Sequence, residues 1–100
     1  MTGEPSHVAL ASLANRTLPP ETKREALKFH KSPAIEGGQV EVHRLANGFR
    51  IDVIGTDNQG KPARLATQHH EDLGQARLIG AWTGAVLCIG YRDFTVETPA

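Results

Sequence analysis

The stretch VEVHRLANGFRIDV, residues 40–53, decides the fold of this chain. Apolar and polar side chains alternate on both sides of Asn47-Gly48, which is the pattern of an antiparallel hairpin with a two-residue turn. If both turn residues have positive φ, the turn determines which residues lie opposite one another. The expected pairs are Ala46 with Phe49, Arg44 with Ile51, His43 with Asp52, and Val42 with Val53.

This register sorts the side chains of the hairpin onto two faces, because neighbouring residues of a strand point in opposite directions. One face carries an apolar set, Val40, Val42, Ala46, Phe49, Ile51 and Val53. The other face carries Glu41, His43, Arg50 and Asp52. We therefore expect a sheet that is covered on its apolar face and hydrated on its polar face.

The length and composition of the chain fit one small domain. It has 100 residues, 39% of them hydrophobic, and a formal net charge of +0, which indicates neither a strongly basic nucleic-acid binder nor an acidic mimic of DNA. The first residues do not resemble a secretion signal, and no apolar run is long enough to cross a membrane, so we expect a cytoplasmic protein. The expected domain covers 1–100, with 1–6 disordered, a helical segment at 7–32 and the sheet and helix core at 39–97.

The N-terminal part of the chain predicts two helices. A short one runs from Val8 to Ala14 and stops near Asn15. Pro19-Pro20 then breaks the chain and begins a second helix over 21–31, which ends at Ser32-Pro33.

The C-terminal part predicts a third strand, a helix and a last strand. Turn-forming residues at 56–62 lead to a strand over 63–67, and a helix follows over 73–83 with Gly84 as its left-handed cap. The apolar run 85–91 indicates a buried strand, in which Cys88, the only cysteine, is an inert thiol. The predicted fold class is α+β, an antiparallel sheet of three to four strands in the order β-β-β-α-β, with one face covered by a helix and an N-terminal helical segment beside it.

The predicted helix at 73–83 has one stripe that can cover the sheet. At 100° per residue, the stripe comprises Leu73, Ala76, Ile79, Gly80 and Thr83, with Gly80 permitting a close approach. Leu78 and Trp82 lie outside this stripe and need a different partner. That partner is either the N-terminal helices or another molecule.

Few residues suggest catalysis or metal binding. His69-His70-Glu71-Asp72, joined by His43, contains zinc-type ligands, but we favour a hydrated helix start because adjacent histidines diverge. The expected cross-strand pair of His43 and Asp52 has no pocket to support acid–base catalysis. Because no nucleophile or phosphate-loop motif is present, we expect no enzymatic activity and no cofactor.

Binding to another macromolecule is the remaining class of function. Aromatic, aliphatic and arginine side chains of the kind that anchor protein interfaces are Arg44, Leu78, Trp82, Tyr91 and Arg92. For Trp82, packing against the N-terminal helices is slightly favoured over a role in an interface. For Arg44, a guanidinium that extends past the end of the sheet is favoured over an interface contact. The alternative is nucleic-acid binding by a basic cluster, Arg16, Lys23, Arg24, Lys28 and Lys31. An exposed strand edge would also allow a homodimer by sheet extension.

The order of elements resembles two groups of small α/β proteins. The elements concerned are Val40-Glu41-Val42, the Asn47-Gly48 turn, 49–54, the helix from Leu73 and the strand at 86–89. They are similar to double-stranded-RNA-binding-like folds, but the acidic Glu71-Asp72 replaces the basic loop that those domains use on phosphates. They also resemble small anti-CRISPR proteins of phages and mobile elements. That resemblance implies an inhibitor that blocks a CRISPR effector complex sterically, through a protein or nucleoprotein partner.

Overall fold

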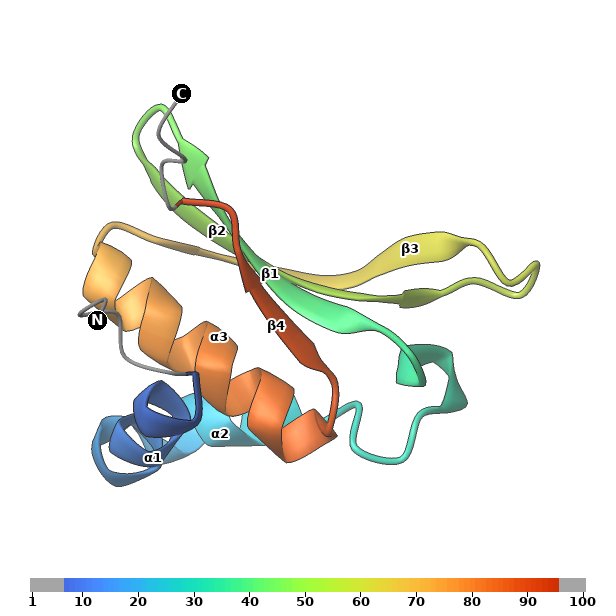
Figure 1. Ribbon diagram of the computed structural model, residues 1–100, viewed down its shortest axis with the longest axis horizontal. Coiled ribbons are helices and arrows are strands. Elements are labelled where there is room, and N and C mark those ends of the chain that lie inside the picture. Colours follow the sequence, from blue (N-terminus) through green and yellow to red (C-terminus); the bar gives the residue numbers. More distant parts are fainter. Residues whose placement is uncertain (1–6, 96–100) are drawn as a thin grey trace, which may run out of the picture.

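A four-stranded sheet with every described helix on one of its faces forms the architecture (Figure 1). The computed structural model describes residues 7–95. Its elements are α1 (His7–Thr17), α2 (Pro20–Leu27), the 3-10 helix η1 (Pro33–Ile35), β1 (Gln39–Leu45), β2 (Gly48–Thr56), β3 (Pro62–His70), α3 (Leu73–Leu87) and β4 (Gly90–Asp93). Residues 1–6, expected to be disordered, lie outside this range, as do the last two residues of the expected core.

The prediction of an α+β fold is confirmed, but the sheet is mixed and not wholly antiparallel. The strand order is β3-β2-β1-β4, and β1 pairs antiparallel with β2 but parallel with β4. The parallel pair arises because α3 carries the chain across the sheet before β4 begins, which is what a parallel connection requires.

The predicted register of the hairpin is wrong by two residues, although the two faces are correct. Leu45 lies opposite Gly48 and Val42 opposite Ile51, so Ala46 and Asn47 form the loop. Asn47 lacks the expected positive φ, since Cys88 is the non-glycine residue with positive φ among residues 7–95. A slip of two residues preserves the faces because side chains alternate with a period of two.

Gly48 is needed for a reason that the turn pattern did not predict. Its φ is +149°, and a Cβ there would lie 2.8 Å from the carbonyl oxygen of His70. The glycine therefore allows β2 to begin beside the end of β3, where Phe49 pairs with His70.

The apolar face of the sheet packs against α3 as predicted. Val40, Val42, Ile51 and Val53 are buried there, together with Ala76 and Ile79 of the helix. A Cβ on Gly80 would lie 2.8 Å from Cε1 of Tyr91 and 2.9 Å from Cγ2 of Val42, so the predicted close approach of this helix to the sheet is confirmed.

The C-terminal end of α3 overturns the prediction for 85–91. The helix continues through Gly84 to Leu87, and Cys88 takes the left-handed cap position with φ of 57°. Gly84 lies inside the helix, and its lack of a side chain lets the chain that leads into β4 pass close by: a Cβ there would lie 3.3 Å from the carbonyl oxygens of Ile89 and Gly90. Cys88 is exposed and is not the buried thiol expected from its apolar neighbours.

Three further boundaries differ from the prediction. α1 continues past Asn15 to Thr17, and α2 ends at Leu27, four residues before the expected end. β3 extends over 62–70, so His69 and His70 belong to a strand and not to the start of a helix. Of the acidic residues expected at the start of α3, Asp72 caps the helix. Its side chain accepts a hydrogen bond from the backbone N–H of Gln75 at 2.8 Å.

The N-terminal helices are the partner that Trp82 requires. Trp82 is only 7% exposed, and its indole N–H donates to Oδ1 of Asn15 at 3.3 Å. The ammonium of Lys23 lies 5.9 Å from the centre of the Trp82 ring. Leu78 is partly buried against the same core. α1 and α2 thus pack against α3 and form a helical layer with it.

Arg77, Asp93 and Thr95 tie α3 to the end of β4. Nε of Arg77 donates to Oδ2 of Asp93 at 2.7 Å, and the backbone N–H of Thr95 donates to Oδ1 at 2.8 Å. Partial burial raises the pKa of Asp93, but the hydrogen bonds from Thr95 and the neighbouring Arg77 outweigh it, so the pKa lies below the usual 3.8.

We expect Arg77→Met to make the protein less sensitive to acid. As the pH falls, the Asp93 carboxyl of the unfolded chain takes up a proton before that of the folded chain, so the stability that its lowered pKa contributes is lost as the pH drops through the folded pKa. Without Arg77 the two pKa values lie closer together and this loss shrinks. Urea unfolding at pH 7 and at pH 3 measures it. An equal loss of stability in wild type and variant between the two pH values would contradict this assignment.

Candidate functional site

The face of the sheet opposite the helices, called the open face below, carries a cluster of titratable groups. Side chains of paired residues share a face, so the register places Glu41 with Asp52 and Arg92, and Arg50 with His43 and His69, on this side. No described helix covers it (Figure 1). The open face is therefore built by all four strands.

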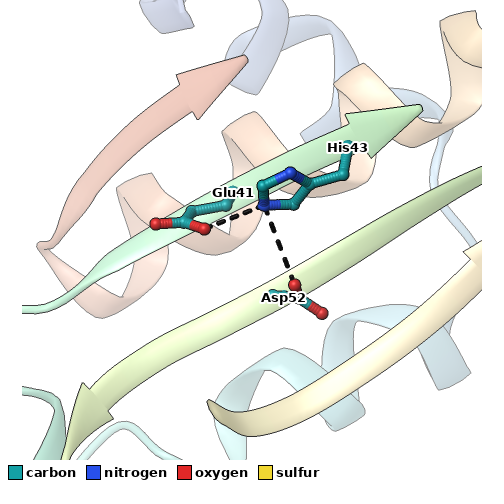
Figure 2. A group of neighbouring side chains, drawn as sticks. All are labelled: Glu41, His43 and Asp52. Carbon is teal, nitrogen blue, oxygen red and sulfur yellow. Dashed lines mark hydrogen bonds and ion pairs between the residues drawn. The ribbon is translucent and has the colours of Figure 1, made fainter. Parts of the chain in front are cut away.

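Glu41, His43 and Asp52 converge at the centre of the open face (Figure 2). Nε2 of His43 lies 2.8 Å from Oε1 of Glu41 and 3.9 Å from Oδ2 of Asp52. The side-chain amide of Gln39 donates to the other oxygen of Glu41. One potential ligand atom from each of the three residues lies within 4.8 Å of the others. The predicted closeness of His43 and Asp52 is confirmed, although the observed register makes them diagonal neighbours.

Asp52 departs from the expectation of a hydrated polar face, because its side chain is only 2% exposed. Two guanidinium groups compensate its charge: Nε of Arg50 lies 3.0 Å from Oδ2, and Nε of Arg64 lies 3.7 Å from Oδ1. Oδ1 itself is buried without a hydrogen-bond partner. A buried carboxylate requires such cations, and one lacking a full set of hydrogen bonds keeps the capacity to bind another group.

The ring of Phe94 covers the imidazole of His43 by stacking on it. The two rings stack with centroids 4.7 Å apart and planes 5° apart, and Cζ of Arg92 lies 4.9 Å from the centre of the Phe94 ring. The backbone N–H of Phe94 donates to the carbonyl of Val42 at 2.8 Å, which holds the ring over β1. Phe94 is nonetheless 44% exposed. Phe94 is not among the interface residues predicted from the sequence, although Arg92, two residues before it, is.

The histidine and acid motif at 69–72 does not form one site. His69 and His70 are consecutive strand residues and point to opposite faces, and Asp72 caps α3. Burial and the neighbouring His69 lower the pKa of His70, which favours its neutral form. His43 therefore joins Glu41 and Asp52 and not this motif.

The predicted interface residues are divided among three places. Trp82 is buried in the helical layer and Leu78 is partly buried there, while Tyr91 packs against Gly80 on the helix side of the sheet. Arg44 is exposed near the hairpin loop, with its guanidinium 5.3 Å from the Phe49 ring, as expected for a side chain that extends past the sheet. Arg92 alone belongs to the open face. Trp82 is thus unavailable as an exposed anchor.

The predicted basic cluster is only partly free to bind phosphate. Arg16, Arg24 and Lys31 are exposed. Lys28 pairs with Glu25 at 2.9 Å, and Lys23 donates to the carbonyl oxygen of Asn15 beside Trp82 at 2.5 Å. Two of the five cations therefore already have partners within the protein.

Comparison with known proteins adds no family to these observations. No protein-family model matches the chain, and no curated protein or solved structure matches it. Among residues 7–95, no helix has the length and apolar character needed to cross a membrane.

Proposed function

We propose that this protein is a non-enzymatic interaction module that binds an acidic surface of a protein or nucleoprotein partner through its open face. The proposal rests on the difference in exposure between the basic and the acidic side chains of that face. The Arg64 side chain is 52% exposed, whereas those of Glu41 and Asp52 are 18% and 2% exposed. Arg92 is also exposed. A partner would therefore meet cations first, with the acids lying beneath them.

Arg92 and Phe94 are the expected anchors of the contact. An exposed aromatic ring in contact with a guanidinium combines apolar area with a directional donor, as energetically dominant interface residues do. This pair takes the place of Trp82 and Leu78 at the centre of the interface. The mechanism stays steric: the sheet occupies a site on the partner and blocks it.

Charge reversal on the open face tests the proposal. Isotope-labelled protein is titrated with a decameric glutamate peptide, a probe for an acidic surface, and its amide resonances are followed by NMR. We expect shifts at residues of the open face, and the double variant Arg64→Glu, Arg92→Glu should weaken binding at least about tenfold, or about 1.4 kcal/mol. The matched control, Arg24→Glu with Lys31→Glu, reverses two exposed cations of the helical layer. Equal weakening by both double variants would reject the open face as the site.

Nucleic-acid binding by the basic cluster is the alternative, and it has less support because Lys23 and Lys28 are engaged. A single-stranded oligonucleotide replaces the peptide in the same titration. Binding that the Arg24→Glu, Lys31→Glu variant removes, and that weakens steeply with salt, would favour this alternative.

A more specific form of the proposal makes the partner a CRISPR effector complex. It rests on the resemblance of element order to anti-CRISPR proteins. Its test is target cleavage by a purified effector complex, which the wild-type protein should inhibit and the Arg64→Glu, Arg92→Glu variant should not.

A further inference from the structure

We propose that Glu41, His43 and Asp52 form a binding site for one divalent transition-metal ion, for which Zn²⁺ is the best-matched probe. The site goes beyond the interaction function and does not depend on it. One imidazole nitrogen and two carboxylate oxygens are a donor set that zinc accepts, with further positions left to solvent. The two strands that supply these donors are the central pair of the sheet.

The observed distances are close to those that an ion would impose. Zinc lies about 2.0–2.2 Å from nitrogen and oxygen ligands, so tetrahedral donors are roughly 3.4 Å from one another. Nε2 of His43 is 2.8 Å from Oε1 of Glu41 and 3.9 Å from Oδ2 of Asp52, on either side of that value. Adjustments of about half an ångström in each side chain would accommodate the ion.

Two features prepare the donors for a ligand. The imidazole of His43 is held in place by stacking on Phe94 at 4.7 Å, which restricts its rotation. Asp52 is 2% exposed, and its Oδ1 has no hydrogen-bond partner, so the carboxylate keeps unused acceptor capacity, while Oδ2, the oxygen nearer His43, accepts from Arg50 at 3.0 Å.

Arg50 and Arg64 affect the site in different ways. Arg50 donates to Asp52 at 3.0 Å and fits the outer hydrogen-bond partner that ligating carboxylates commonly have. Arg64 lies 3.7 Å from the unused oxygen, and its positive charge competes with a cation. The two guanidinium groups balance the two carboxylates before any ion binds. We therefore expect weaker affinity than at a structural zinc site, and an increase in affinity when Arg64 is neutralised.

Calorimetric titration of the full chain with Zn²⁺ at pH 7, before and after substitution, tests the site. The wild type should bind one ion. His43→Gln should weaken binding by at least about tenfold, the lower end of what losing even an outer partner of a metal site costs. Arg64→Gln should strengthen binding. His69→Gln and His70→Gln are the controls and should leave the affinity unchanged, because their side chains lie outside the cluster.

Opposite effects of His43→Gln and Arg64→Gln would not follow from a purely structural role of these residues. Should His43→Gln fail to fold, as judged by circular dichroism, Glu41→Gln takes its place with the same expected loss. Absence of Zn²⁺ binding by the wild type, or loss of binding in the His69 and His70 controls, would overturn the proposal. These results are independent of the peptide titration, so the metal site and the interaction function can fail separately.

Discussion

Trp82→Ala is expected to lower the free energy of unfolding by about 3–5 kcal/mol, the usual cost of removing a large buried aromatic side chain. Trp82 is 7% exposed and joins the helical layer through its contacts with α1 and α2. Its removal leaves a cavity between α3 and these helices. Chemical denaturation followed by circular dichroism measures the change.

Two further measurements make this prediction specific. Trp82→Phe keeps the ring volume in part and loses the hydrogen bond to Asn15, so it should cost less than Trp82→Ala. Leu13→Ala is the matched control, because Leu13 belongs to α1 but is 41% exposed and should change stability little. In the wild type, Trp82 fluorescence should be blue-shifted and shielded from a soluble quencher. Strong quenching, or a loss of stability in Trp82→Ala no greater than that in Leu13→Ala, would mean that Trp82 is exposed and not buried.

Gly55→Ala is expected to destabilise the protein by about 3 kcal/mol, the upper part of the usual range for overpacking. A Cβ at this position would lie 2.2 Å from the carbonyl oxygen of Ala34 and 2.6 Å from Cδ1 of Leu65. The backbone of Ala34 has little freedom to move, because the Thr56 hydroxyl donates to the same carbonyl at 3.3 Å. The clash must therefore separate η1 from β2.

Gly90→Ala is the control for this substitution. A Cβ there would meet only Cβ of Gln39 at 3.6 Å, which is an ordinary contact. Thermal or urea unfolding of both variants should show a large loss for Gly55→Ala and a change of less than about 1 kcal/mol for Gly90→Ala. Similar stabilities of the two variants would mean that η1 does not pack against β2 as described.

The faces of the sheet could be predicted from the sequence, because they depend on alternation alone. A hairpin slipped by two residues still buries Val42 and Ile51 together and still brings His43 near Asp52. The exact register could not be predicted, since Ala46 and Asn47 form the loop without the positive φ that the Asn47-Gly48 pattern implies.

The end of α3 could not be predicted because the apolar run after Gly84 fits a buried strand and a buried helix equally well. Contact with β4 decides between them, and that contact is tertiary. The same limit applies to the candidate site. Glu41, His43 and Asp52 could be assigned to one face in advance, but the burial of Asp52 depends on Arg64 from β3 and Arg50 beside it. The stacking of Phe94 on His43 depends on the chain running beside β1 just after β4, where the N–H of Phe94 donates to the carbonyl of Val42.

The parallel pairing of β4 with β1 has a consequence for assembly. β1, β2 and β3 are joined by short loops and can pair as the chain emerges, whereas β4 reaches β1 only after α3 has been completed. Until then β1 is an edge strand, and its unpaired backbone N–H and C=O groups can pair with those of a neighbouring molecule. A polypeptide that stops before Gly90 is therefore expected to aggregate more readily than the whole chain, because the shortest strand covers the residues 39–42 of β1.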